Sequence, residues 1–455
     1  MQSDKKALRR VAMASVIGAT IEWYDFFLYG IVAGIVFNKL YFPAGDPTIN
    51  TLLAYATFAV GFAARPIGGI VFGHFGDRVG RKSMLIITLV IMGLSTFAMG
   101  VIPTFEQIGY WAPALLILCR VVQGIGLGGE WGGAILMAYE FAPTSKRGFY
   151  ASLPQVGLSL GVLLSAGYLG LMSAILTDEQ FMLWGWRVGF IVSCGLVFFG
   201  LWIRLKIVET PDFSKVKEKN KEAAIPFFDM IKRYPRNTLL GLGARHIDGV
   251  FFNIFSVFSI NYLTQTLHFP RDTSLIGVMI GAVTLTVFIP VFGHLSDKLG
   301  RIRLYGWASL ITAASCFPAF WLMQSANGNI YLVWLAIAVP FGVIYAAVYG
   351  TVSSFLCDLY DARVRYTGIS FVYQFSSVTA GGLTPIIATM LLATGNGDPI
   401  YICAYVLASG ILSALCTYLI GRGDKATPSP EAFSSEPGQY RIPQADSTRI
   451  TNPTL

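Results

Sequence analysis

The stretch GHFGDRVGRK, residues 73–82, places glycines, one acid and three basic residues between two apolar segments. It recurs in the second half of the chain as GHLSDKLGRI, residues 293–302. Each half also carries an acidic residue followed seven positions later by an arginine: Glu140 and Arg147, then Asp358 and Arg365. Two motifs that repeat at nearly the same distance indicate two homologous halves, each with its own charged loop.

The composition indicates a membrane protein. Of the 455 residues, 54% are hydrophobic and 13% are charged, and the mean hydropathy is +0.60. Soluble domains carry roughly 25% charged residues. About a dozen apolar blocks are long enough to cross a bilayer, which predicts an all-α polytopic protein with twelve transmembrane helices. We place the spans near residues 11–37, 50–74, 83–103, 112–141, 148–175, 184–206, 238–266, 273–295, 303–324, 329–358, 364–393 and 398–421.

The net charge of +8 follows the topology rather than a nucleic-acid partner. Basic residues gather in alternate loops, and such loops face the cytoplasm. Both termini are therefore predicted to be cytoplasmic in a multi-pass protein of the cell (inner or plasma) membrane. The predicted domain organisation is a cytoplasmic N-terminus at 1–10, six-helix bundles at 11–206 and 238–421, a cytoplasmic linker at 207–237, and a disordered cytoplasmic tail at 422–455.

Several motifs resemble one transporter family. They are GHFGDRVGRK together with EWYDF at 22–26, ARPIGG at 64–69, RVVQGIGLGGEWGG at 120–133 and WGWR at 184–187. With these motifs the chain resembles the major facilitator superfamily, and within it the metabolite:proton symporter family. That family includes permeases for shikimate, α-ketoglutarate, citrate and proline/betaine, and within it the chain looks like the shikimate and α-ketoglutarate permeases. The resemblance implies two pseudo-symmetric six-helix bundles that give alternating access to a central site.

Three acids lie within predicted spans and are candidates for proton coupling. Glu22 and Asp25 are three residues apart, so they share one face of a helix. Glu130 lies among glycines, which suggests a tight helix crossing with a polar pocket. An intramembrane carboxylate faces a cavity or a cation, or binds a proton. Structural ion pairing is the alternative role. The resemblance adds Arg120 as the superfamily's span 4 arginine, which is associated with proton transfer.

A second set of intramembrane residues is predicted to bind substrate. Arginine keeps its charge under all ordinary conditions and binds carboxylates through two parallel hydrogen bonds. Each arginine also has a structural alternative to substrate binding. Arg65 could pair with an acid to hold the fold, and Arg245 could pair with Asp248. Uncharged side chains in two later spans could reach a substrate hydroxyl. The predicted substrate-binding residues are Arg65, Arg245, Asp248, Asn253, Tyr373 and Gln374.

The charged loops predict a conformational lock. Glycines permit a tight turn, and Asp77 can accept hydrogen bonds from a helix N-terminus in the other half. The resemblance implies that the two clusters lock the outward-open state and break when the protein opens inward. Topology determination alone is the other interpretation. The predicted lock residues are Gly73, Asp77, Arg78, Gly80, Arg81, Glu140, Arg147, Asp297, Arg301, Asp358 and Arg365.

These features favour a proton-coupled symporter that imports a small organic acid, such as shikimate or a di- or tricarboxylate. The alternatives are a proton-driven exporter of the same fold and a symporter of zwitterionic osmolytes such as proline or betaine. The fifth span lacks the GPxxGG element of many exporters, and the proline-broken tail cannot form the heptad helix of osmosensing relatives. Enzymatic activity, cofactors and metals are not expected. The expected partners are the substrate, protons and the lipid bilayer, and we expect a monomer.

Overall fold

A computed structural model describes residues 2–43, 47–205 and 226–423. Within these ranges, twelve helices are long and apolar enough to cross a membrane, which confirms the twelve predicted spans. Most boundaries agree within a few residues, including the second span, whose helix begins at Pro47, but the sixth span begins earlier than predicted, at Asp178. The predicted tail, apart from its first two residues, and most of the predicted linker lie outside the described residues.

The first half of the chain forms six spans with short connecting helices. Their bounds are α1 Gln2–Val32, η1 Ala33–Phe37, α2 Asn38–Leu40, α3 Pro47–Arg78, α4 Arg81–Val101, α5 Phe105–Ile108, α6 Trp111–Phe141, η2 Thr144–Lys146, α7 Arg147–Ser152, η3 Leu153–Gln155, α8 Val156–Ile175, α9 Asp178–Gln180, η4 Phe181–Gly185 and α10 Trp186–Leu205.

The second half repeats this plan after one short helix. Its elements are α12 Pro226–Arg233, α13 Pro235–Ala244, α14 His246–Asn253, η5 Ile254–Phe258, α15 Ser259–Asn261, η6 Tyr262–Thr266, α16 Arg271–Leu299, α17 Arg301–Ala314, α18 Cys316–Gln324, α19 Ile330–Ile337, η7 Ala338–Ile344, α20 Tyr345–Cys357, α21 Arg365–Ser377, η8 Val378–Gly382, α22 Thr384–Thr394 and α23 Ile400–Gly423.

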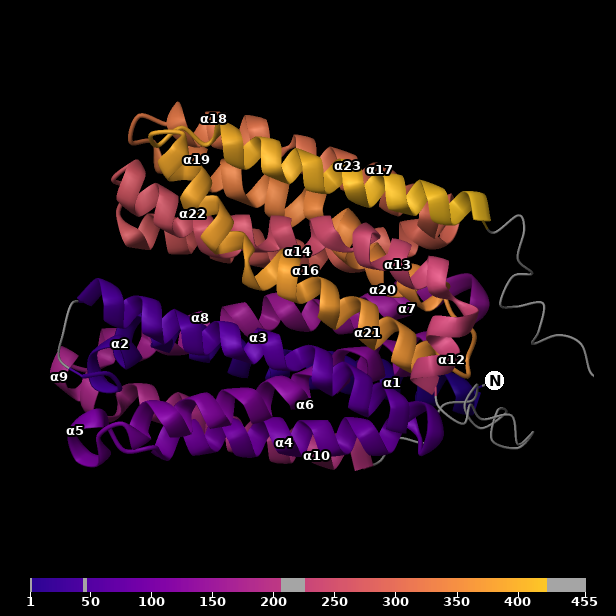
Figure 1. The fold of residues 1–455 in the computed structure, drawn as a ribbon, viewed down its shortest axis with the longest axis horizontal. Coiled ribbons are helices and arrows are strands. Elements are labelled where there is room, and N and C mark those ends of the chain that lie inside the picture. Colours follow the sequence, from indigo (N-terminus) through magenta and orange to yellow (C-terminus); the bar gives the residue numbers. More distant parts are fainter. Residues whose placement is uncertain (1, 44–46, 206–225, 424–455) are drawn as a thin grey trace, which may run out of the picture.

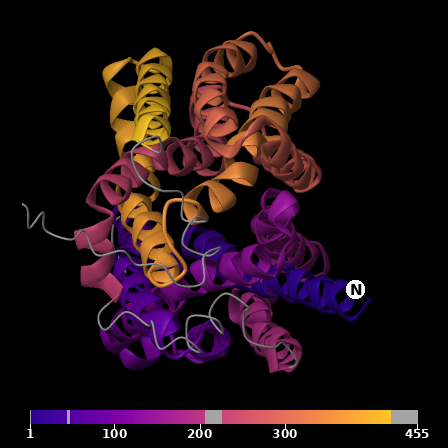
Figure 2. The ribbon, with the colours of Figure 1, turned by 90° about the vertical axis from the view of Figure 1, so that its right-hand side faces the viewer.

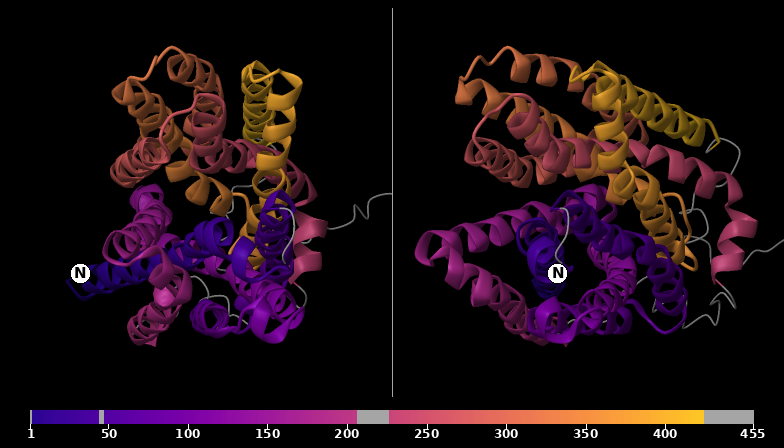
Figure 3. Two further views of the ribbon diagram at one scale, coloured as in Figure 1. Left: turned by 90° about the vertical axis from the view of Figure 1, so that its left-hand side faces the viewer. Right: turned by 60° about the vertical axis from the view of Figure 1, so that its left-hand side comes forward.

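The two halves lie side by side as separate helix bundles (Figure 1). We call residues 2–205 the N-half and residues 226–423 the C-half. Views of the two ends show the same division (Figures 2 and 3). The halves meet along two seams, where α3 packs on α21 and α16 packs on α7 and α8. Because the seams involve corresponding helices of the two halves, the interface is pseudo-symmetric.

Glycines bring α3 close to α6 and so fix the backbone that carries Arg65. A Cβ on Gly128 would lie 2.1 Å from the carbonyl oxygen of Arg65, and one on Gly124 would lie 2.3 Å from that of Gly61. No side chain fits at such distances, so only glycine allows this crossing.

Three π-helical turns interrupt spans of the C-half beside its centre. Each adjoins a buried polar side chain: η5 follows Asn253, η7 precedes Tyr345, and η8 follows Ser377. A π-turn changes the helical register by part of a turn, and such turns are frequent at functional sites. Here they help to set the direction of polar side chains that line one cavity.

Candidate functional site

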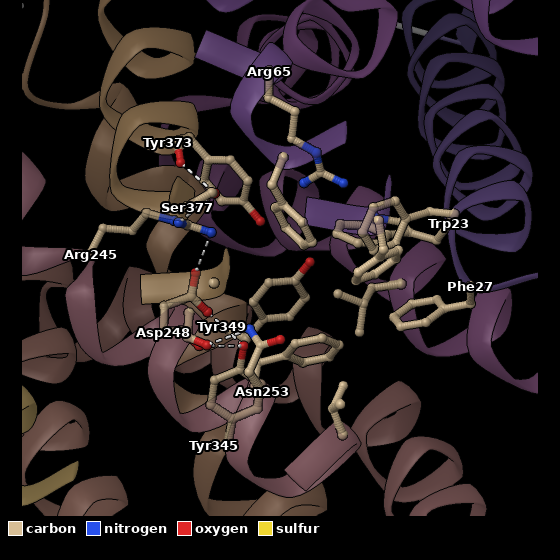
Figure 4. Close-up of a pocket in the computed structure, with 18 residues that line it drawn as sticks. Trp23, Phe27, Arg65, Arg245, Asp248, Asn253, Tyr345, Tyr349, Tyr373 and Ser377 are labelled. Atoms are coloured by element: carbon tan, nitrogen blue, oxygen red, sulfur yellow. Dashed lines mark hydrogen bonds and ion pairs between the residues drawn. The ribbon is translucent and has the colours of Figure 1, made fainter. Parts of the chain in front are cut away.

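A cavity lies between the halves, midway along the helices that meet there (Figure 4). Its N-half wall is mostly aromatic, with Trp23 and Phe27 among its residues. Its C-half wall carries tyrosines, with hydroxyl groups next to an arginine and an aspartate. Five of the six predicted substrate-binding residues line the cavity: Arg65, Arg245, Asp248, Asn253 and Tyr373.

The sixth, Gln374, is placed elsewhere. Its amide nitrogen donates across the seam to the carbonyl oxygen of Gly128 at 3.2 Å and, more weakly, to that of Leu127 at 3.4 Å. It is not among the cavity-lining residues. Gln374 therefore helps to join α21 to α6. Its neighbour Tyr373 stacks on Trp131 with ring centroids 3.6 Å apart, so two consecutive residues of α21 contact the N-half.

Arg65 is a buried cation without a counter-ion. Its side chain is 3% exposed, and in the described part of the chain no carboxylate lies within ion-pair distance of it. Its guanidinium lies 4.5 Å from the ring centroids of both Phe26 and Phe62, so aromatic faces hold it. Its Nε and Nη2 atoms are buried without a hydrogen-bond acceptor. This geometry is not the structural ion pair that was the alternative role for Arg65.

Unlike Arg65, Arg245 has a carboxylate that balances its charge. Its Nη2 lies 3.1 Å from Oδ2 of Asp248, one turn further along span 7. Its Nη1 donates to the hydroxyls of Ser376 and Ser377 at 2.9 and 2.8 Å. The guanidinium also lies 3.6 Å from the ring centroid of Tyr373. Both alternatives for Arg245 and Asp248 therefore hold, since they pair with each other and also line the cavity.

Asp25 is a fully buried carboxylate that only hydroxyl groups contact. Thr96 donates to its Oδ2 at 3.0 Å, and Ser193 donates to its Oδ1 at 2.5 Å. Within the described ranges, no cation forms an ion pair with Asp25. Burying an isolated carboxylate is costly, whereas a protonated one is cheap to bury. The arrangement suits a group that gains and loses a proton.

A hydrogen-bond chain connects Asp25 to Arg120. Thr96 donates to Asp25, Gln123 donates to Thr96 at 2.8 Å, and Arg120 donates to Gln123. The Arg120 guanidinium lies 4.0 Å from the ring centroid of Tyr29. Sequence reasoning missed the two connecting residues because small hydroxyls and amides are common in apolar helices.

Glu22 lies on α1, one helical turn before Asp25. It is 2% exposed and forms no ion pair with the described residues. Two carboxylates, Glu130 and Asp25, and two arginines, Arg65 and Arg204, lie near enough to act electrostatically on Glu22.

Glu130 has the partner that Asp25 lacks. Arg204 binds it through both Nη atoms, and Thr88 donates to its Oε2 at 2.7 Å. Arg204 also donates to the carbonyl oxygen of Leu85 at 2.6 Å. Sequence reasoning did not single out Arg204, because it lies near the end of span 6 and resembles a topology-determining arginine. Glu130 therefore forms a bidentate ion pair with Arg204.

One end of the molecule carries the predicted lock, and we call it the charged end. The N-terminus, α12 and the end of α23 lie there (Figure 1). Oδ2 of Asp77 accepts from the backbone nitrogen and hydroxyl of Thr367 at 3.0 and 2.9 Å, which joins α3 to the start of α21. Glu140 pairs with Arg365 of the C-half at 3.1 Å and with Arg81 at 3.6 Å.

The second cluster repeats the first with one addition. Asp297 accepts from the backbone nitrogens of Gly148 and Phe149 at 2.7 and 3.0 Å. Arg301 bridges Asp297 at 3.1 Å and Asp358 at 2.6 Å. The addition is Tyr139, whose hydroxyl donates to Asp358 across the seam at 2.5 Å. Each aspartate thus binds the first turn of a helix in the opposite half, where backbone N–H groups favour negative charge.

The remaining lock residues have smaller parts in this geometry. Gly80 has φ of 133°, which favours glycine and ends the turn before α4. Gly73 lies so close to α21 that a Cβ would be 2.8 Å from Cα of Thr367. The Arg147 guanidinium lies 4.6 Å from the ring centroid of Tyr139. Arg78 is exposed and makes no ion pair with the described residues.

Sequence comparisons agree on one family. A family model described as Sugar (and other) transporter matches residues 11–238, and one described as Major Facilitator Superfamily matches residues 247–444. A shikimate transporter of Escherichia coli (strain K12) is 40% identical, over 92% of this chain and 95% of its own. An inner membrane metabolite transport protein of that organism is 41% identical, over 84% and 87%.

Other similar proteins are transporters named for different substrates. A proline/betaine transporter of Salmonella typhimurium is 34% identical over 90% of this chain and 84% of its own. Among solved structures, the proton:xylose symporter bound to 6-bromo-6-deoxy-D-glucose aligns with a TM-score of 0.73 at 17% identity, covering 94% of this chain and 99% of that one. That similarity shows a shared fold, and the relatives named here are transporters rather than enzymes.

Proposed function

Because this chain belongs to the major facilitator superfamily and is a multi-pass membrane transporter, we propose that it imports a small organic acid together with protons. One observation carries the proposal. The N-half buries a cation without an anion, Arg65, and a carboxylate without a cation, Asp25. A substrate carboxylate balances the first and a proton balances the second.

The other predicted groups take supporting roles in this proposal. The chain through Thr96 and Gln123 lets Arg120 respond to the protonation state of Asp25. An ionised Glu22 attracts the Arg65 guanidinium electrostatically. In this proposal that attraction favours release of the substrate carboxylate from Arg65. Glu130 with Arg204 holds α6 against α10 around this network. The polar residues of the C-half wall bind the uncharged part of the substrate.

In this proposal the charge clusters at the charged end control alternating access. Its clusters join the halves through contacts to the first turns of α21 and α7. In this proposal the contacts hold the charged end closed and break together when the cavity opens toward it. The basic loops support a cytoplasmic location for this end and for both termini. The monomer is the transporting unit, since one chain supplies both walls of the cavity.

Purified protein in liposomes with an imposed pH gradient tests the proposal. Uptake of labelled shikimate, α-ketoglutarate, citrate and betaine is followed together with internal pH. Uptake of one acid with matching internal acidification supports proton symport. Extrusion of preloaded substrate while protons enter, so that the interior still acidifies as substrate is lost, would identify a proton-driven exporter instead. If no acid moves under any gradient, the proposal is wrong.

Uptake of a zwitterion is the second candidate. Relatives 33–34% identical carry the name proline/betaine transporter. The aromatic faces of Trp23 and Phe27 could receive a quaternary ammonium while Arg65 binds the carboxylate. Accumulation of betaine but of no acid in the same liposomes would favour this candidate.

A further inference from the structure

We propose that the cavity selects acids with one carboxylate and several hydroxyl groups over di- and tricarboxylates. This inference rests on the proposed function and specifies its substrate class. It follows from the charge balance of the cavity wall and from the distribution of hydrogen-bonding groups around it.

The cavity wall carries one net positive charge. The charged residues that line it are Arg65, Arg245 and Asp248. The last two form an ion pair at 3.1 Å, so their charges cancel at the wall. Arg65 remains as the uncompensated charge among the described lining residues. One ligand carboxylate neutralises the cavity, and a second carboxylate would leave it negative.

Arg65 also lacks the hydrogen-bond acceptors that a carboxylate would supply. Two of its nitrogens are buried without an acceptor, and the aromatic rings around it can provide none. An unpaired buried guanidinium is strongly destabilising, so the site favours a ligand anion at this position. Figure 4 shows the guanidinium facing the space between the walls.

The opposite wall offers no free cation to a second carboxylate and accepts hydroxyl groups. Asp248 already occupies Arg245 there, and the Tyr345 hydroxyl donates to Asp248 at 2.6 Å. The Tyr349 hydroxyl is buried without a hydrogen-bond partner in the described structure. The Asn253 amide nitrogen donates to the Gly249 carbonyl at 2.8 Å, which leaves its oxygen as an acceptor. These neutral groups suit ligand hydroxyls, which both donate and accept.

Ligand binding to the purified full-length protein tests the inference without any proton gradient. Trp23 lines the cavity, so tryptophan fluorescence reports occupancy. The probes are shikimate and gluconate as hydroxylated monocarboxylates, against α-ketoglutarate, citrate and betaine. We expect at least one of the first two to bind tenfold or more tightly than each of the others. Equal or tighter binding of α-ketoglutarate or citrate would overturn the inference, and so would preferential binding of betaine.

A charge-relocation variant gives the sharper test. Asp248→Asn frees the charge of Arg245 and raises the net charge of the wall to two. We expect the ratio of α-ketoglutarate to shikimate affinity to rise about tenfold or more. Asp272→Asn is the matched control, because it makes the same chemical change at an exposed position at the start of α16. An unchanged ratio in Asp248→Asn would contradict the charge argument.

A further variant covers the case in which Asp248→Asn does not fold. Arg65→Gln removes the net charge, and we expect at least a tenfold loss of monocarboxylate affinity. Arg65→Lys should recover part of that affinity. Full affinity in Arg65→Gln would overturn the inference. Binding with the expected order but no proton-driven uptake would instead reject the proposed function and leave the ligand class standing.

Discussion

Asp25 and Glu130 are both buried acids of the N-half, yet their surroundings give them different roles. Hydroxyl groups alone contact Asp25, whereas Arg204 and Thr88 bind Glu130. The Glu130 carboxylate is committed to an ion pair, and removing either partner leaves a buried charge uncompensated. The Asp25 carboxylate has no such partner, so a proton is the group that can compensate its charge. We therefore propose Asp25 rather than Glu130 as the coupling group, although both acids look alike in the sequence.

The first prediction concerns Asp25→Asn. The amide keeps the size of the side chain and can still bond to Thr96 and Ser193, so the fold should persist. It cannot release a proton, so uphill uptake driven by a pH gradient should be lost while exchange of labelled for unlabelled substrate continues. Paired uphill and exchange assays in liposomes measure this. Wild-type accumulation by the variant would contradict the assignment of Asp25.

The second prediction concerns Glu130→Gln. It leaves Arg204 buried and unpaired, and breaking a buried ion pair costs about 3–5 kcal/mol. We expect a large loss of thermal stability, measured by unfolding in detergent. Transport activity should be low as well, because little folded protein remains. Adding Arg204→Met should restore part of the stability, because no unpaired charge then remains. A stable Glu130→Gln protein that has lost only proton coupling would instead assign Glu130 the same coupling role as Asp25.

At the scale of elements, the lock consists of acids on helix N-termini. Asp77 binds the start of α21 and Asp297 binds the start of α7, so each half caps a helix of the other. Such a cap contributes about 0.5–2 kcal/mol. We propose that the two caps and their arginines bias the charged end toward closure and break in each transport cycle.

The third prediction removes both caps. Asp77→Asn with Asp297→Asn should shift the population toward a state in which the charged end is open. Spin labels at Val79 and Leu299, which are exposed on opposite halves at this end, report the separation as a distance distribution. Arg78→Gln is the control, since Arg78 is exposed and forms no ion pair with the described residues. An unchanged distribution in the double variant would argue for topology determination alone.

The fourth prediction concerns the loop between spans 10 and 11, outside the membrane. Arg363 donates to Asp361 at 2.6 Å, and Tyr234 donates to it at 3.1 Å. Burial alone would raise the pKa of Asp361, but the hydrogen bonds and charge of Arg363 outweigh it and hold this pKa below its ordinary value. A lowered folded-state pKa stabilises the fold above the unfolded pKa, about 3.9, and this contribution is lost as the pH falls.

Asp361→Asn should therefore lower the melting temperature at pH 7, and its difference from wild type should shrink below about pH 4. Thermal unfolding in detergent across this range measures it, with Asp272→Asn as the exposed control. A deficit that stays constant with pH would show that the carboxylate charge does not stabilise this loop.

Most elements could be predicted from the sequence, because membrane spans and charged loops are local signals. The twelve spans follow from apolar block length, and the two lock loops follow from the repeat. The partners inside the N-half could not be predicted in the same way. Arg204 reaches Glu130 from a position 74 residues further along the chain, and Ser193 reaches Asp25 across 168 residues. Such pairs depend on helix packing, which no local pattern encodes.

At the scale of the whole molecule, the two halves divide the work. The N-half holds Arg65 and Asp25, the buried charges to which we assign the substrate and the proton, while the C-half wall has its own charges paired. Arg120 and Glu22 are also buried in the N-half and form no ion pair with the described residues. In the proposed function, substrate charge and proton therefore both act on the same bundle.

In the proposed function the C-half supplies neutral recognition and, through Asp297 and Arg365, half of the lock. We propose that one substrate anion and one proton must balance the charges of the N-half before the halves move relative to each other about their seams.

The fifth prediction follows from that balance. One monoanion on Arg65 and one proton on Asp25 add no net charge, so transport should be electroneutral. Uptake under a fixed pH gradient should then be insensitive to a potassium–valinomycin potential. If a second proton moved, each 100 mV inside negative would add about 2.3 kcal/mol, which is about fiftyfold in accumulation. Such a response would assign the second proton to Glu22, and Glu22→Gln should then abolish it.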